Sequence, residues 1–193
     1  MTGNLNDDLA THAPVPSGDP DFDLLNRFNH LLSRHDDRGL ALSLAAFAED
    51  TLGSLLLTYL VDSKQSKDLV DGFNAPLGTL ASRMKAAFAV GLLTKEQYED
   101  LEVARKIRNL FAHDWEEVSL ERPDIRSMIG QLHGYNFDQS PMPTDPRKRL
   151  QYSIANVLTE LRVQIAQHRK HGRRAPFAGF RLTTIKPGSS NGA

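Results

Sequence analysis

One segment near the middle of the chain carries side chains of the kind that take part in acid–base or phosphate chemistry. The segment RKIRNLFAHDW spans residues 105–115 and has a helical pattern. On a helix Arg105, Asn109 and His113 lie four positions apart and share a face, with Arg108 beside it. Histidine can transfer a proton near neutral pH, and arginine can stabilise developing phosphate charge. The segment therefore predicts either a polar network that fastens a core or a site that meets a substrate or partner.

The acidic partners that such arginines would need are scarce in the apolar parts of the sequence. A guanidinium removed from water without partners costs several kcal/mol, so a buried one requires carboxylates or carbonyls. Glu49 and Asp50 are the acids inside the apolar stretch 38–61, and a carboxylate can pair with arginine through two hydrogen bonds. We therefore predict one semi-buried polar cluster, and its role as a structural network or as a binding site stays open. Its predicted members are Arg38, Glu49, Asp50, Arg83, Arg105, Arg108, Asn109 and His113.

The elements that must position these residues are predicted to be helices. Apolar side chains recur at helical spacing through most of the chain, and the stretch 38–61 is apolar all round, as a central buried helix would be. Thr94 and Gln97 have the spacing of a capping box at a helix start. Residues 62–75 are interpreted as a polar link. The predicted helices span residues 19–35, 38–61, 76–93, 94–115, 123–134 and 146–170.

The length and composition fit one domain with two tails. The chain has 193 residues, of which 40% are hydrophobic, enough for one sizeable core. No alternating strand pattern is present. We predict an all-α fold, a single multi-helix bundle with flexible N- and C-terminal tails. The expected parts are a disordered arm over residues 1–18, the helical domain over 19–171 and a basic flexible tail over 172–193.

Several classes of function are disfavoured by what the sequence lacks. It has no cysteine, its histidines show no HExxH spacing, and no glycine-rich loop follows a strand, so we predict no metal and no cofactor. No apolar run reaches the roughly 18 residues that span a bilayer. The N-terminal residues lack the basic and apolar regions of a signal peptide. We therefore expect no membrane association and a cytoplasmic location.

Charge is distributed unevenly along the chain. From Arg169 onward there are six basic residues and no acid, so with an overall charge of −1 the preceding part carries −7. A reader of duplex DNA usually needs a basic face on its folded domain, so direct and specific DNA binding by the domain is disfavoured. DNA binding through the basic C-terminal tail is kept as an alternative.

Three longer segments resemble the mannitol operon repressor family, MtlR. They are RGLALSLAAFAED (38–50), PLGTLASRMKAAFAVGLL (76–93) and YEDLEVARKIRNLFAH (98–113), and the resemblance extends roughly over residues 38–115. The resemblance implies an all-helical, cytoplasmic bacterial protein without a recognisable DNA-binding motif. It further implies a repressor of genes for mannitol uptake and metabolism that acts through a protein partner, and not an enzyme. Whether the chain forms a homodimer is left open.

A shorter segment supports a different class of function. RNLFAH, residues 108–113, is similar to the Arg-x4-His element of HEPN-type helical proteins. That similarity implies a metal-independent RNase or a toxin–antitoxin component. Its catalytic pair would be Arg108 and His113, brought together from two subunits. This alternative stands beside the regulator hypothesis.

Overall fold

A computed structural model describes residues 16, 18, 20–114, 118–133 and 142–172. Every regular element in this part of the chain is an α-helix, which confirms the all-α prediction. The predicted arm and basic tail lie almost wholly outside the described residues, so the domain limits stay predictions. The helices are α2 (Pro20–Leu32), α3 (Asp37–Tyr59), α4 (Lys64–Val70), α5 (Leu80–Ala89), α6 (Lys95–His113), α7 (Pro123–Gly130) and α8 (Pro146–His171).

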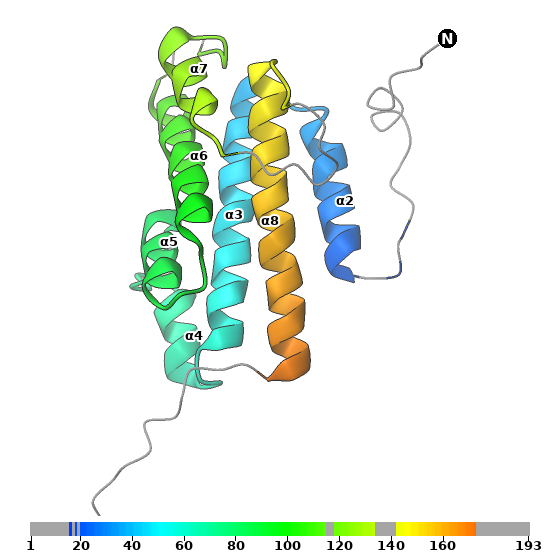
Figure 1. Ribbon diagram of the computed structural model, residues 1–193. Helices are drawn as coiled ribbons and strands as arrows, with labels where there is room; N and C mark the ends of the chain where they lie inside the picture. Colours follow the sequence, from blue (N-terminus) through cyan, green and yellow to red (C-terminus); the bar gives the residue numbers. More distant parts are fainter. Residues whose placement is uncertain (1–15, 17, 19, 115–117, 134–141, 173–193) are drawn as a thin grey trace, which may run out of the picture.

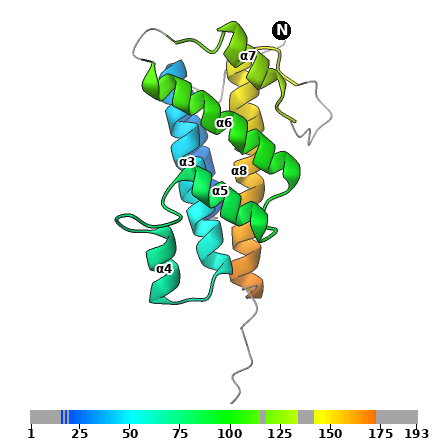
Figure 2. The same cartoon turned by 90° about the vertical axis from the view of Figure 1, so that its left-hand side faces the viewer.

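Two long helices, α3 and α8, form the centre of the bundle (Figure 1). They run in the same direction, because Arg147 contacts Asp37 near the start of both helices and Arg162 contacts Asp50 further along. The short helix α2 packs on one side of this pair. Helices α5 and α6 cross the other side, as Figure 2 shows face-on.

Helix α3 supplies much of the core, as its all-round apolar sequence predicts. Its buried residues cover most of its circumference, since α2, α4, α5, α6 and α8 all pack against it, and one stripe, Leu42, Ala46 and Asp50, stays exposed. The helix is long and apolar enough to cross a membrane by length and composition, yet 56% of its most apolar window is buried in the bundle. Its apolarity is therefore accounted for by its central place in the fold.

The capping box predicted from Thr94 and Gln97 is confirmed, and side-chain and glycine caps also limit α8. At the start of α6, Thr94 Oγ1 accepts from Gln97 N while Gln97 Oε1 accepts from Thr94 N, which completes the capping box. Asp145 caps α8 by accepting from Lys148 N at 2.7 Å. Gly172 ends α8 in the left-handed conformation with a φ of 64°.

Three expectations about helix limits are wrong. The polar link over 62–75 contains α4, whose sequence KQSKDLV is too short and polar to show an apolar stripe but is capped by Ser63. The helix expected from residue 76 begins only at Leu80. Gly78 N donates to Ala75 O at 2.9 Å in a turn, and Thr79 then caps α5. Similarly, α7 ends at Gly130 rather than at residue 134.

Candidate functional site: arginine contacts between helices

The most buried polar contact among the predicted residues is made by Arg83 of α5. The residue is 9% exposed, and its guanidinium donates to three backbone carbonyls, those of Leu77 (2.8 Å), Glu49 (2.7 Å) and Val70 (2.9 Å). It also contacts Asp71 Oδ1 at 3.3 Å. These acceptors come from α3, from the end of α4 and from the following loop. One arginine therefore joins three segments to α5.

A glycine on α3 makes this approach possible. A Cβ added at Gly53 would lie 2.7 Å from Arg83 Nη1 and 2.9 Å from Cζ, closer than real contacts allow. Gly53 lies one turn after Glu49, so the missing side chain leaves the Glu49 carbonyl accessible for a second hydrogen bond. The Glu49 carboxylate meanwhile accepts from Leu80 N at 2.8 Å, at the start of α5. Glu49 and Arg83 thus lie together, but the arginine binds the backbone oxygen of Glu49.

Arg38 fastens the opposite end of the bundle. It donates to the carbonyls of Phe111 (2.7 Å) and Asp114 (2.8 Å), at the end of α6. The last carbonyls of a helix have no partner within the helix and carry partial negative charge, so a cation stabilises them. The Asp114 carboxylate contacts Arg122, just before α7. Arg38 therefore ties the start of α3 to the end of α6.

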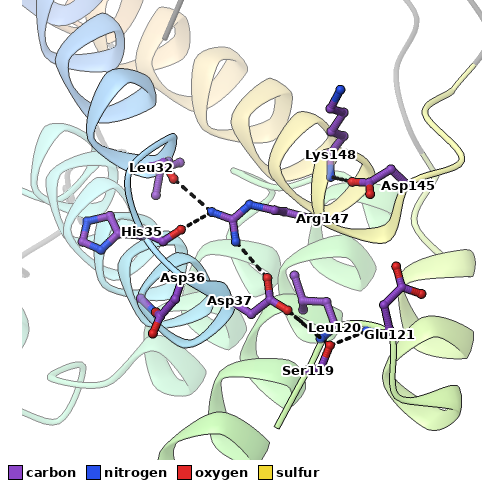
Figure 3. Close-up of polar contacts among 11 residues, drawn as sticks. Leu32, His35, Asp36, Asp37, Ser119, Leu120, Glu121, Asp145, Arg147 and Lys148 are labelled. Atoms are coloured by element: carbon purple, nitrogen blue, oxygen red, sulfur yellow. Dashed lines mark hydrogen bonds and ion pairs between the residues drawn. The ribbon is translucent and has the colours of Figure 1, made fainter. Parts of the chain in front are cut away.

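A second polar junction centres on Arg147 of α8 and involves Asp37, the residue before Arg38 (Figure 3). Arg147 pairs with Asp37 Oδ1 at 2.8 Å and donates to the carbonyls of Leu32 and His35, which lie between α2 and α3. The other carboxylate oxygen of Asp37 accepts from Leu120 N at 3.0 Å. Sequence reasoning missed both charged residues. Their only signal is position, since Asp37 directly precedes one predicted helix and Arg147 stands in the first turn of another.

Asp50 has a partner that the sequence did not indicate. Its Oδ2 lies 3.2 Å from Nη2 of Arg162, a residue of α8 that is 5% exposed. The same guanidinium lies over the ring of Phe47, 5.1 Å from its centroid, and Phe47 stacks on Phe28 of α2 at 4.0 Å. Asp50 therefore belongs to the contact that joins α2, α3 and α8.

Arg105 pairs within its own helix. Its Nε and Nη2 donate to the two carboxylate oxygens of Glu102 at 2.8 and 2.7 Å. These hydrogen bonds lower the pKa of Glu102 and raise the pKa of Arg105. Both side chains are about a quarter exposed. The pair lies three positions apart on α6, so it adds little to the packing between helices.

The proposed catalytic pair lies on the surface of α6. Arg108 is exposed and donates to Asn109 Oδ1 at 3.1 Å, and His113 is exposed in the last turn. Five positions on a helix correspond to a rotation of about 140°, so the two side chains leave the helix in different directions. Within one chain Arg108 and His113 therefore do not form a common site.

The single polar cluster predicted from the sequence is corrected by these contacts. Its members divide into an Arg83–Glu49 contact, an Arg38 contact with the end of α6, an Asp50–Arg162 pair and the surface residues of α6. The prediction that Glu49 and Asp50 would neutralise the arginines of α6 is wrong. Arg105 and Arg108 instead contact Glu102 and Asn109 on their own helix. Backbone carbonyls, which a sequence does not reveal as acceptors, accept from Arg38 and Arg83.

One further titratable contact was missed. Asp100 of α6 is 1% exposed, and its Oδ1 accepts from the backbone N of His133 (3.0 Å) and lies 2.9 Å from the ring Nδ1. The ring Nε2 lies 3.2 Å from Glu99. The hydrogen bond with Asp100, and the charges of Asp100, Glu99 and Glu96, raise the pKa of His133. No group of three or more acidic or histidine side chains in the described residues is arranged to hold a metal ion.

Comparison of the sequence with known proteins identifies related proteins and a family profile. The sequence profile of the MtlR family, described as mannitol repressor, matches residues 60–169. Mannitol operon repressors from two Escherichia coli strains, K12 and O6:H1 CFT073, are each 34% identical to the chain over 65 residues. That alignment covers 34% of this chain and 33% of each relative, so it spans about a third of the curated proteins.

The fold is shared with a solved structure. The chain is similar to the protein in the X-ray structure of the MtlR-HPr complex from Escherichia coli, with a TM-score of 0.55 and 23% identity. The likeness covers 74% of this chain and 98% of the solved chain, and at this identity it establishes the helical fold. With a family profile matched over more than half of its length, the chain belongs to the mannitol repressor family.

Proposed function

We propose that this protein is a transcriptional regulator of the mannitol repressor type, which controls genes for sugar-alcohol uptake and metabolism by contacting another protein. The observation that carries the proposal is the family match over residues 60–169. This match includes α4 to α8 almost completely, and so contains the Arg83 contacts and the whole of α6. A repressor is not an enzyme, and we propose no catalytic activity.

The partner that we propose is a protein of the HPr type. The solved relative with the same fold is described as a complex with HPr, which supports a protein surface as the functional element of this fold. Regulation by protein contact requires a surface that stays accessible on a stable scaffold. The arginine contacts described above provide such a scaffold because they fasten helix ends and loops. We also propose a cytoplasmic location, which the match to a family of repressors supports.

Direct reading of DNA by the described helices is not part of the proposal. The first half of α6 carries Glu96, Glu99 and Glu102 on or near its surface, and phosphates would repel them. The basic tail lies outside the described residues, so DNA contact by residues 172–193 stays a separate prediction. No contact among the described residues favours the RNase alternative.

The proposal is tested by binding measurements on the full chain. Purified HPr from the same organism is titrated into the protein and followed by calorimetry, and a stoichiometric complex is expected. Promoter DNA from its mannitol genes is then tested in a gel-shift assay at physiological salt, and no shift by the protein alone is expected. Failure to bind HPr would contradict the proposed partner. A shift that disappears on deletion of residues 172–193 would support the tail instead.

A further inference from the structure

The loop between α4 and α5, residues 71–79, is internally organised although it lies at the surface. Leu77 N donates to Leu69 O at 2.9 Å, and Ala75 N donates to Gly72 O at 3.3 Å. Gly72 has a φ of 118° and Asn74 a φ of 60°, so the chain turns sharply on both sides of Phe73. The loop projects from the bundle on the left of Figure 2.

The loop is held to the core from behind by Arg83. The buried guanidinium donates to Val70 O just before the loop and to Leu77 O within it, and it contacts Asp71. Its third carbonyl contact, to Glu49, anchors the same guanidinium to α3. Since both ends of the loop are bonded to one buried group, the loop has little conformational freedom to lose when it meets a partner.

The residue at the tip is an aromatic with no role in the fold. Phe73 is 98% exposed, more than any other large apolar side chain among the described residues. Placing a whole phenyl ring in water forgoes about 1.5–3 kcal/mol that burial would provide. A preformed loop with an exposed aromatic tip has the character of an interface anchor, because buried aromatic side chains carry much of the binding energy at protein interfaces.

We propose that Phe73, held by the Arg83-bonded loop, is the anchor that docks into an apolar pocket of the regulatory protein partner. This inference rests on the proposed function and deepens it by assigning the contacting element. The segment PLGTLASRMKAAFAVGLL, which carries part of the family resemblance, contains both Pro76-Leu77-Gly78 of the loop and Arg83, which holds the loop. Their role is to position Phe73, and Phe73 makes the contact.

The surroundings of Phe73 indicate a reversible partner rather than a second copy of the chain. The polar residues close to Phe73 in the sequence, Lys67, Asp68, Asp71 and Asn74, are all exposed. One aromatic anchor inside a polar rim is typical of non-obligate interfaces, whereas obligate homodimers bury larger and more apolar faces. The charges on this rim have both signs, so the anchor and its pocket, more than net charge, would determine the contact.

The test is a comparison of two alanine variants in the HPr titration. Phe73→Ala is expected to weaken binding about tenfold or more, as removal of a hot-spot aromatic does. Leu31→Ala is the matched control, since Leu31 is a large apolar side chain, 54% exposed, at the far end of the bundle. It is expected to bind like the wild type. Both variants should keep the wild-type melting temperature, because neither side chain lies in the core.

The outcomes separate this inference from the proposed function. Selective weakening in Phe73→Ala supports the anchor. Equal binding by the wild type and Phe73→Ala overturns the anchor and leaves the regulator proposal intact, with the partner contacting another surface. Absence of binding by the wild type overturns both. Self-association of the wild type in sedimentation, abolished in Phe73→Ala, would assign the anchor to a second copy and contradict the inference.

Discussion

Two regions that carry the family resemblance, the loop–α5 segment and the end of α6, use arginine in opposite ways. Arg83 is 9% exposed and donates to three carbonyls from two other elements and the adjoining loop. Arg108 is exposed and donates to its neighbour Asn109. In the sequence both are cations within apolar segments. Their difference shows that the helix face, together with the acceptors that other segments bring, decides whether an arginine fastens the fold.

The difference has an energetic reason. A buried guanidinium is stable only where its donors are all matched, and loop or helix-end carbonyls supply acceptors without the cost of burying a second charge. Gly53 makes room for that arrangement on α3. At the end of α6 no comparable recess is needed, since the side chains of Arg108 and His113 remain in water. Each of the following predictions tests this contrast.

The largest effect is expected at Arg83. Arg83→Met keeps most of the side-chain volume but leaves the carbonyls of Val70 and Leu77 without their donor. Each such loss costs about 1–3 kcal/mol, so the free energy of unfolding should fall by about 3 kcal/mol or more. Chemical denaturation monitored by circular dichroism measures this change. Arg83→Lys should recover less than half of the loss, because a single ammonium cannot span the same acceptors. Wild-type stability in Arg83→Met would refute the contrast.

A smaller effect is expected at Gly53. Gly53→Ala places a Cβ where the guanidinium of Arg83 lies, and overpacking of this kind costs about 1–3 kcal/mol. Gly130→Ala is the matched control: it is also a helical glycine, but nothing lies within 4 Å of its added Cβ. Alanine has the higher helix propensity, so the control should be neutral or slightly stabilising. If Gly53→Ala equals the control in thermal unfolding, the close approach of Arg83 has no energetic weight.

Much of the fold could be predicted from the sequence because its signals are local. The apolar circumference of residues 38–61 identified the central helix, and Thr94 with Gln97 marked the start of α6 correctly. Helix α4 was missed because seven mostly polar residues carry no periodic signal. Local patterns therefore predict long helices well, and short helices that depend on tertiary contacts poorly.

The candidate site was less predictable because its contacts are not local. Pairing Arg83 with Val70 O or Arg38 with Phe111 O requires knowing which backbone carbonyls lack other partners in three dimensions. Sequence reasoning assigned the arginines to acidic side chains instead, because a sequence identifies acidic residues but not the positions of backbone carbonyls in the fold. The residues singled out at Arg38, Glu49 and Arg83 do make contacts between helices, but Glu49 lies with Arg83, whereas Arg38 contacts the end of α6 at the opposite end of the bundle.

A modest pH effect is expected from His133, whose exposure lies between that of the buried Arg83 and that of the exposed Arg108. Its pKa is raised above the ordinary 6.5, first by the hydrogen bond with Asp100. The stabilisation from protonated His133 is therefore fully present below about pH 6.5 and is lost as the pH rises through its higher folded value. The side chain is 37% exposed, so screening should keep this contribution under about 1 kcal/mol.

The pH effect is measured as the difference in unfolding free energy between the wild type and His133→Gln from pH 5.5 to 9. The difference should shrink with rising pH, since the variant lacks the charge that the wild type loses. Glu96, Glu99 and Asp100 are the acidic groups that act on the ring from α6. A difference that stays constant with pH would mean that His133 acts only through packing and its neutral hydrogen bonds.

The smallest effect is expected at the end of α6, where the sequence first suggested chemistry. Arg108→Ala and His113→Ala remove exposed side chains, so each should change the free energy of unfolding by no more than about 0.5 kcal/mol. The wild type and both variants should leave RNA uncleaved, because the regulator proposal gives Arg108 and His113 no catalytic role. Incubation of each protein with labelled RNA checks this expectation. If the wild type cleaved RNA and both variants lost cleavage at an unchanged melting temperature, the α6 surface would be the active region. Arg83 would then serve only to hold the fold that presents this surface.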